Sequence, residues 1–300
     1  MRYNWQEKDW PEFRYDLSVV EDALLAFAER TGRTGGLLKG LPEDAQAEAI
    51  IDLMVAEAIK TSAIEGELLS RKDVTSSIRR NLGMDVGTPS GDRRAEGAAA
   101  LMVDVRKSFA APLSDVTLYE WHRMIMAGSR GIKAGRWRTH AEPMQVVSGP
   151  AGKEKVHFEA PPSSKVPEEM KRFIDWFNET GSGGSKEIKR AAVRSAVSHL
   201  YFESIHPFED GNGRTGRAIS EKALSQGLGR PVLLSLSRMI EADRKRYYQA
   251  LQEGQKSNEI TPWVNWFVTM ALDAQIHAEE QIDFTLKKTR LFDRFRDQLN

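Results

Sequence analysis

One short segment combines residue types that together could carry out chemistry on a phosphate group. Between Ile205 and Arg217 the chain places a histidine, an aspartate, glycines around an asparagine, and two arginines. The imidazole of His206 can accept a proton at neutral pH. Asp210 supplies the hard oxygen ligand that Mg²⁺ prefers, together with phosphate oxygens. The segment therefore predicts a phosphate site next to a proton acceptor.

The spacing within this segment explains how a phosphate could be held. Pro207 ends the preceding helix, and glycines in Gly211–Gly213 allow several backbone N–H groups to converge on one point. Such a concave arrangement at the N-terminus of a helix binds phosphate. Arg214 and Arg217, three residues apart, share one face of the following helix and can each hold phosphate oxygens through two hydrogen bonds.

Helices must position this segment, because apolar residues recur at three- and four-residue spacing along most of the chain. The only strand pair that the pattern favours joins Trp137–Thr139 to Gln145–Ser148, and the polar stretch after it reads as an exposed loop. The class is therefore all-α with a small β-hairpin. The predicted helices are Leu17–Glu29, Glu43–Glu65, Arg94–Ser108, Ser114–Ala127, Pro167–Asn178, Ser185–Ser204, Thr215–Gln226, Glu241–Glu253 and Pro262–Leu299.

Bulk composition excludes several classes of function. Lysine plus arginine (43) equals aspartate plus glutamate (43), so nothing draws the chain as a whole to nucleic acid or an anionic membrane. The absence of cysteine excludes disulfides, thiolate metal sites and a cysteine nucleophile. The start of the chain is polar and aromatic, and no apolar run is long enough to span a bilayer. We therefore expect a cytoplasmic protein without direct nucleic-acid or membrane binding.

The segment from His206 to Arg217 resembles the Fic motif, His-x-Phe-x-Asp/Glu-Gly-Asn-Gly-Arg-x-x-Arg, at every defined position. The similarity extends over roughly Arg94–Phe267 and includes a flap hairpin, here Gly135–Arg138 with Val146–Ser148. The resemblance implies the Fic fold, a helical bundle with a small β-hairpin flap.

The same resemblance implies three parts of the chain. Residues 1–92 would form an N-terminal helical domain, residues 93–270 the Fic catalytic core, and residues 271–300 a C-terminal helix. The glycine- and proline-containing stretch Gly83–Asp92 marks the first boundary.

The activity that the resemblance implies is the transfer of AMP from ATP to a Ser, Thr or Tyr hydroxyl of a target protein, with release of pyrophosphate. His206 would deprotonate the hydroxyl, Phe208 would anchor the loop, and Asp210 would hold Mg²⁺ across the α- and β-phosphates. The remaining phosphate contacts would come from Gly211, Asn212, Gly213, Arg214 and Arg217, with an added side-chain contact from Asn212.

Two further sets of residues follow from the resemblance. The adenine pocket would be lined by Tyr247, Tyr248, Leu251 and Gln255. The last position is usually asparagine in the family, and both tyrosines could equally be core residues. In the flap, Val146 and Val147 would align the target segment by main-chain pairing, a form of strand addition.

An upstream element resembles the inhibitory motif of the family, Ser/Thr-x-x-x-Glu-Gly/Asn. Here it reads Thr61 to Gly66, with Glu65 one helical turn after Thr61. In relatives of this kind the glutamate pairs with the second motif arginine, here Arg217. The resemblance thus implies an enzyme of the class II type, whose inhibitory helix precedes the catalytic core in the same chain.

Several alternatives stay open at this point. The same fold could remove AMP from a modified protein, with Glu65 activating a water, or could transfer another phosphate-containing group. An idle nucleotide-binding interaction module is the alternative from a different class. The target protein is unidentified, and self-modification and a homodimer also remain open. The chain could continue beyond residue 300 into a winged-helix domain.

Overall fold

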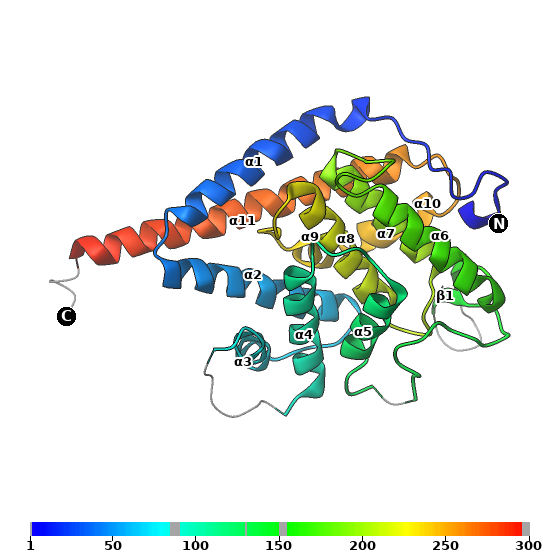
Figure 1. Ribbon diagram of the computed structural model, residues 1–300, viewed down its shortest axis with the longest axis horizontal. Helices are drawn as coiled ribbons and strands as arrows, with labels where there is room; N and C mark the ends of the chain where they lie inside the picture. The colour runs from blue at the N-terminus through cyan, green and yellow to red at the C-terminus, as the bar shows by residue number, and fades with distance from the viewer. Residues whose placement is uncertain (1, 85–90, 130, 150–154, 296–300) are drawn as a thin grey trace.

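The fold is built almost entirely from helices. The structure is a computed structural model that describes residues 2–84, 91–129, 131–149 and 155–295. Within these residues it contains eleven α-helices, three short 3-10 turns and one two-stranded antiparallel hairpin (Figure 1). The prediction of an all-α class with a small hairpin is confirmed.

Several helices begin where short polar side chains can satisfy their first N–H groups. The hydroxyls of Ser70, Ser114 and Ser235 accept such hydrogen bonds at the starts of α3, α5 and α9. The helices are α1 Glu21–Lys39, α2 Glu43–Ile64, α3 Arg71–Asn81, α4 Arg93–Lys107, α5 Asp115–Ile125, α6 Val166–Glu179, α7 Ala191–Ile205, α8 Asn212–Leu228, α9 Leu236–Ala242, α10 Arg244–Gly254 and α11 Thr261–Phe295. The hairpin pairs β1 Gln145–Ser148 with β2 Lys155–Glu159.

Helix α7 packs against α6, α8 and α11, and every one of its residues is buried. Its Val197 belongs to a core cluster that includes Phe267 of α11, whereas its Tyr201 belongs to a second cluster with Phe173 of α6. Helix α8 packs along α7. Because α7 is buried on every side, even its polar residues, such as Arg194 and His199, are enclosed by other elements. This packing fixes the place where α7 ends and therefore the place of His206.

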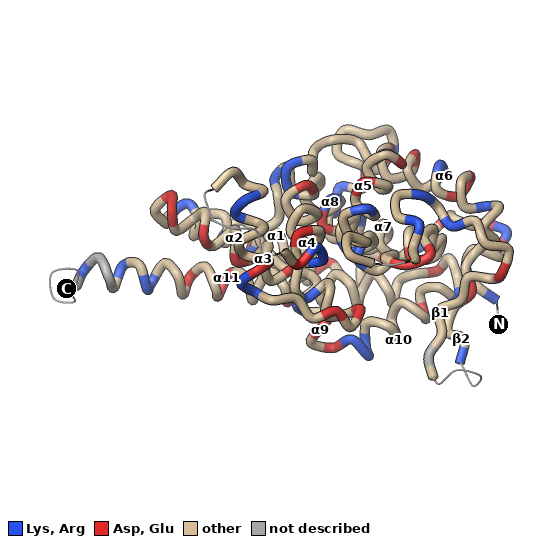
Figure 2. The backbone as a smooth tube through the Cα atoms, turned by 90° about the horizontal axis from the view of Figure 1, so that it is seen from below, with Lys and Arg blue, Asp and Glu red and all other residues tan. Residues whose placement is uncertain are grey.

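Helices α1 and α11 pack side by side along one edge of the molecule (Figure 1). Gln275 joins them, accepting a hydrogen bond from Thr31 (3.2 Å) and donating one to Thr34 (2.7 Å). The side chain of Glu279, itself 7% exposed, pairs with Arg30 at 3.2 Å. Along the outer part of α11 acidic residues come first and basic residues follow towards its end, and both kinds are mixed over the rest of the molecule (Figure 2).

The predicted strand pairing is wrong in its first partner. Strand β1 pairs with β2, not with Trp137–Thr139, and its register sets Val146 opposite Phe158, with an irregularity before Val147. The segment around Trp137 is held elsewhere, because the N–H of Arg138 donates to Pro207 O (2.9 Å). The flap is therefore formed by β1, which was expected as a strand, and by β2, which lies in the stretch that we expected to be a loop.

Several predicted helix bounds also need correction. Helix α7 begins at Ala191 rather than Ser185, because the N–H groups of Lys186 and Ile188 bond to the carbonyls that end α6. Helix α8 begins at Asn212 rather than Thr215, since Thr215 N–H already donates to Gly211 O (3.0 Å).

Other helices differ from their predicted bounds because their apolar residues recur less regularly. Helix α3 was not predicted, and α1 continues ten residues past its predicted end at Glu29. The predicted helix Glu241–Glu253 is divided at Asp243 into α9 and α10.

The predicted domain division stays a prediction. Residues 85–90 of the proposed first boundary lie outside the described residues, as does the predicted end of the last helix at Leu299. No helix in the described part of the chain is both long and apolar enough to cross a membrane.

The contact between α4 and α5 requires a residue without a side chain. A Cβ added at Gly97 would collide with the backbone oxygen of Met124 and lie 2.9 Å from Ala127 Cβ. We predict that Gly97→Ala lowers the free energy of unfolding by about 1–3 kcal/mol, because backbone cannot move aside cheaply. In contrast, Gly32→Ala in α1, where the added carbon meets no atom within 4 Å, should raise it by up to about 1 kcal/mol. Urea unfolding of both variants checks this; equal effects would contradict it.

Candidate active site

His206 lies where α7 ends and the chain turns into α8. Pro207 disfavours helical backbone in the residue before it, so α7 stops at Ile205. His206 adopts the left-handed conformation (φ 49°, ψ 61°), and its N–H donates to Phe202 O (2.9 Å). This conformation is uncommon for a residue with a side chain and is often found at functional sites. The side chain of His206 remains 14% exposed.

Asn212 closes the loop that follows. Its Oδ1 accepts a hydrogen bond from Phe208 N–H, and its Nδ2 donates to Phe208 O, both at 2.9 Å. The fully buried ring of Phe208 stacks on His122, with ring centroids 3.9 Å apart. Phe208 is thus buried as an anchor must be, while the amide of Asn212 is used to shape the loop. The side-chain phosphate contact expected of Asn212 stays a prediction, since Nδ2 has a second N–H besides the one that bonds to Phe208 O.

His122 supports the same loop from α5. Its Nδ1 accepts a hydrogen bond from Gly135 N–H (2.9 Å), so its Nε2 carries the proton and donates to Asp210 O (3.1 Å). Burial lowers the pKa of His122, and the backbone and charge of Asp210 only partly oppose that shift. The lowered pKa favours the neutral ring. His122 therefore positions the backbone beside Asp210.

Arg138 is a buried clamp between the His206 turn and the base of the flap. Its guanidinium donates to the carbonyl oxygens of His206 (2.8 Å), Pro161 (2.5 Å) and Ile205 (3.3 Å), and to the hydroxyl of Ser163 (2.9 Å). Burial lowers the pKa of Arg138 to about 10, so it remains charged near neutral pH. The clamp occupies carbonyls that the end of α7 leaves without helical partners.

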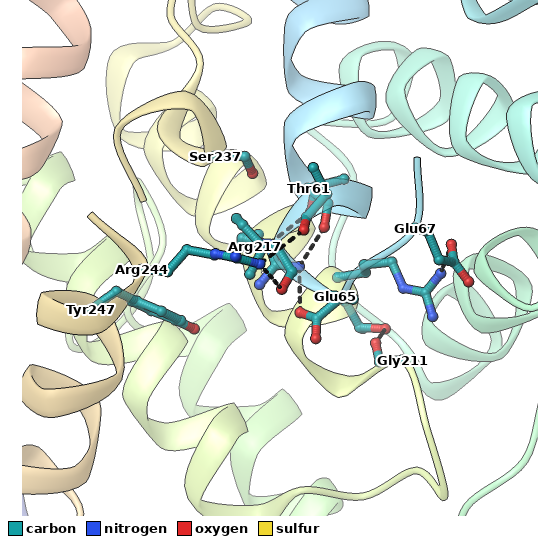
Figure 3. A network of polar contacts seen from close by, with 12 residues as sticks. Thr61, Glu65, Glu67, Gly211, Arg217, Ser237, Arg244 and Tyr247 are labelled. Carbon is teal, nitrogen blue, oxygen red and sulfur yellow. Dashed lines mark hydrogen bonds and ion pairs between the residues drawn. The ribbon is translucent and has the colours of Figure 1, made fainter. Parts of the chain in front are cut away.

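Arg217 is buried between α8 and the end of α2. Its Nε donates to Thr61 Oγ1 (2.7 Å), and its Nη2 donates to Thr61 O (3.0 Å) and Glu65 Oε1 (2.8 Å), as Figure 3 shows. Burial alone would lower the pKa of Arg217, but Glu65 and nearby groups raise it. The pair that the resemblance implied, between Glu65 and Arg217, is thus present in the structure.

The end of α2 fixes the position of Glu65. Helix α2 ends at Ile64, and Gly66 follows in the left-handed conformation (φ 84°) that glycine adopts without cost. Arg244 donates to the last carbonyls of α2, those of Ala63 (3.2 Å) and Ile64 (3.3 Å). The Glu65 carboxylate lies so close to the start of α8 that a side chain at Gly213 would collide with it. An anionic group therefore already occupies the N-terminal end of α8.

A second acidic residue engages the other motif arginine. Glu67 Oε2 lies 2.7 Å from Arg214 Nη1, and the side chain of Arg214 is only 6% exposed. Asp210 Oδ1 lies 3.9 Å from Arg214 Nη2 and accepts a hydrogen bond from Gly211 N–H (2.6 Å). The Asp210 side chain is 56% exposed, so its carboxylate can be reached from solvent.

The four residues expected around adenine have different environments. Tyr247 is 1% exposed, and its hydroxyl bonds to His199 Nε2 (2.9 Å), whereas Tyr248 is 43% exposed. Leu251 is buried, and Gln255 is buried with its amide donating to Glu203 O (3.1 Å). Tyr247 is therefore a core residue, and among the four only the ring of Tyr248 is substantially exposed.

The flap presents Val147 to solvent, with 46% of its surface exposed, while Val146 is half-buried. Both lie on β1 and both pair with β2. The structure thus provides a short exposed strand but leaves target alignment a prediction.

Sequence reasoning missed four residues that shape this site: Glu67, His122, Arg138 and Glu203. The i,i+3 spacing of Glu203 and His206 on one helix was a readable signal. In contrast, the contacts of Glu67, His122 and Arg138 join segments far apart in the sequence, and no local pattern indicates them.

Buried polar groups that have no partner within the described residues fit a phosphate ligand. Arg217 Nη1 and Arg214 Nε are two such donors. The described residues contain no group of three or more His, Cys, Asp or Glu side chains that could hold a metal by themselves. Mg²⁺ commonly binds through one or two carboxylates and completes its shell with phosphate oxygens and water. Exposed Asp210 fits that mode of binding.

The comparisons with known proteins agree with this geometry. Residues 112–224 match the Fic/DOC family, and residues 3–84 match a domain of unknown function (DUF4172). Protein adenylyltransferase Fic from Nematostella vectensis is 28% identical over 174 residues, 58% of this chain and 35% of the relative. Protein adenylyltransferase fic-1 from Caenorhabditis elegans is 28% identical over 149 residues, 50% of this chain and 25% of the relative. The chain thus matches only about a quarter to a third of these curated relatives.

Solved structures show the same fold. A Fic family protein from Desulfovibrio desulfuricans G20 has a TM-score of 0.67 at 23% identity, covering 90% of this chain and 77% of that one. Fic-1 (residues 134–508) from C. elegans has a TM-score of 0.64 at 22% identity, covering 91% and 74%. The turn at His206, the family match over it and these folds lead to one conclusion: residues 112–224 of this chain form a Fic domain.

Proposed function

We propose that this protein transfers AMP from ATP to a hydroxyl of a target protein, and that Glu65 holds the site in an inhibited state. The observation that carries the proposal is the single turn that joins His206 to the two arginines of α8, each with a buried donor that has no partner among the described residues. The names of the relatives, protein adenylyltransferases, support the same class of reaction.

The triphosphate would take the place of acidic side chains that now neutralise the arginines. Arg217 would bind the terminal phosphate once Glu65 moves away, and Arg214 would bind its neighbour in place of Glu67. The first N–H groups of α8 would bind phosphate oxygens in the space beside Gly213. The partly exposed ring of Tyr248 would contact the base.

His206 would accept the proton of the attacking hydroxyl. The hydroxyl oxygen forms a bond to the α-phosphorus, while the bond from that phosphorus to the oxygen bridging it to the β-phosphate breaks. Pyrophosphate leaves with the electron pair of that bond, and AMP stays on the target. Mg²⁺, held by Asp210, would neutralise charge on the phosphate oxygens. The site works only if the α-phosphate lies beside His206, which depends on where Arg217 holds the other end of the triphosphate.

Glu65 opposes that placement. It occupies the face of Arg217 that the terminal phosphate needs, and its carboxylate lies at the start of α8. ATP bound beside an intact pair would meet a negative charge in the wrong position. The target protein, self-modification, a homodimer and a cytoplasmic location stay predictions.

Glu65→Gly is expected to increase AMP transfer by about 10- to 100-fold, because it removes a charged hydrogen bond of roughly 1.5–3 kcal/mol that competes with the phosphate. Incubation with Mg²⁺, host lysate and ATP labelled at either the α- or the γ-phosphate measures it, with Glu65→Gly/His206→Ala as control. Only the α-label should appear on protein. Transfer of the γ-label would indicate a kinase. Release of AMP from a premodified target would indicate the reverse reaction. If neither label appears on protein and no AMP is released, the protein would be an idle nucleotide-binding module.

His206→Ala, made in the Glu65→Gly protein, should lower the rate of AMP transfer by about 10²- to 10⁴-fold, the usual contribution of a positioned general base. Its affinity for ATP, measured by calorimetry, should stay within about twofold of the parent, because no phosphate contact is assigned to the imidazole. Retention of full transfer activity would reject His206 as the base.

Glu67→Gln tests whether the second acidic residue adds to the inhibition. Because Glu67 pairs with Arg214 at 2.7 Å, its neutralisation in the Glu65→Gly protein should tighten ATP binding by about 3- to 10-fold, consistent with about 1 kcal/mol for a partly exposed ion pair. Glu48→Gln, which makes the same change of charge in a more exposed pair with Arg79 away from the turn, is the control. Equal ATP affinity in both variants would show that Glu67 has no inhibitory part.

A further inference from the structure

A buried carboxylate lies directly behind His206. Glu203 precedes it by three residues on α7, and Glu203 Oε2 lies 3.5 Å from His206 Nδ1. The Glu203 side chain is only 5% exposed. Both Glu203 Oε1 and His206 Nδ1 have no hydrogen-bond partner in the described part of the chain. Burying a carboxylate costs free energy unless a hydrogen-bond donor or a positive charge nearby offsets that cost.

Helix α8 limits the positions that the carboxylate can take. A Cβ added at Gly216 would lie 2.5 Å from Glu203 Oε1 and 3.3 Å from His199 Cε1. Gly216 occupies a variable position of the motif, between the two arginines, yet only the absence of a side chain leaves room for Glu203. The helix that carries the phosphate-binding arginines therefore also holds Glu203 against the imidazole.

The carboxylate is negatively charged at neutral pH. Burial alone would raise the pKa of Glu203, but His206 and the positive charge of Arg217 help to lower it below its ordinary value. His199, on the preceding turn of α7, also faces it. Burial lowers the pKa of His199, and Ser220 and Tyr247 occupy its two ring nitrogens. His206 is thus the neighbour whose ring nitrogen is left for Glu203.

We infer that Glu203 is a positioning residue that binds the Nδ1–H of His206, so that Nε2 carries the lone pair that accepts the proton of the attacking hydroxyl. The inference rests on the proposed function, since it assigns the atom through which His206 acts. A distance of 3.5 Å exceeds a normal hydrogen bond, and contacts of this kind often shorten when substrate binds. Glu203 does not touch the substrate, and its effect passes through the imidazole.

If Glu203 had only a structural role, its removal would change the kinetics in a different way. Glu203 could serve only to balance the charge of Arg217, although no atom pair between them comes within ion-pair distance in the described residues. Its loss would then weaken ATP binding and raise the KM for ATP. A positioning role instead predicts a loss in kcat at unchanged KM, together with a change in the tautomer of His206.

The test uses the full chain with Glu65→Gly as parent. Glu203→Gln should lower kcat for AMP transfer by about 10- to 100-fold, less than removal of the base itself, with the KM for ATP within about twofold. In ¹⁵N-histidine spectra recorded without nucleotide, His206 of the parent should be protonated at Nδ1, and Glu203→Gln should shift protons to Nε2. Glu209→Gln, the same change of charge in the same loop, is the matched control and should alter neither.

Two further variants keep the test informative if Glu203→Gln does not fold. Glu203→Asp shortens the side chain, and Gly216→Ala displaces the carboxylate without removing it; both should reproduce the loss of kcat and the change in tautomer. Unchanged tautomer and kcat in the folded variants would overturn the inference, as would a rise in KM alone. If the parent transfers no AMP, the proposed function fails, but the spectra still decide whether Glu203 controls the protonated nitrogen.

Discussion

A buried guanidinium needs a negative partner, and Arg217 imposes that requirement on the whole site. Arg217 lies between α2 and α8 with 2% of its side chain exposed, and Glu65 supplies the neutralising charge. Removing one partner of a buried pair typically costs about 3–5 kcal/mol, because the other charge is left alone. The structure therefore favours an anion at this position, whether a glutamate or a phosphate. Under the proposed function, exchange of Glu65 for a phosphate would couple the position of the end of α2 to nucleotide binding.

The loop around His206 is rigid for a related reason. Its polar groups are satisfied by fixed partners that come from several parts of the chain. Asn212 bonds to Phe208 from within the loop, His122 holds the backbone beside Asp210, and Arg138 holds the carbonyl of His206. Each partner is itself buried, so a shift of one would leave others unsatisfied. The imidazole is held in an uncommon backbone conformation by this network rather than by its own preference.

The sequence alone was sufficient for those features that depend on local pattern. The periodicity of apolar residues predicts the helical class. The two sequence motifs predict the turn from His206 to Arg217 and the pairing of Glu65 with Arg217. The strand partner of Gln145–Ser148 could not, since it depended on Arg138 being held by Pro207. Glu67 and the clamp at Arg138 escaped prediction because their partners lie far away in the sequence. The start of α7 was misplaced because loop N–H groups bond back to α6, which no apolar pattern reveals.

Thr61 makes two of the three hydrogen bonds to Arg217, one through its hydroxyl and one through its backbone carbonyl. Both acceptors on Thr61 are neutral, and neither bond involves Glu65. When Glu65 withdraws, the guanidinium therefore stays tethered to α2 with its plane already oriented. An incoming anion meets a pre-organised cation and need not restrain a freely rotating side chain, so little conformational entropy is lost on binding. The helix that would block the site under the proposed function thus also keeps Arg217 oriented for an incoming anion.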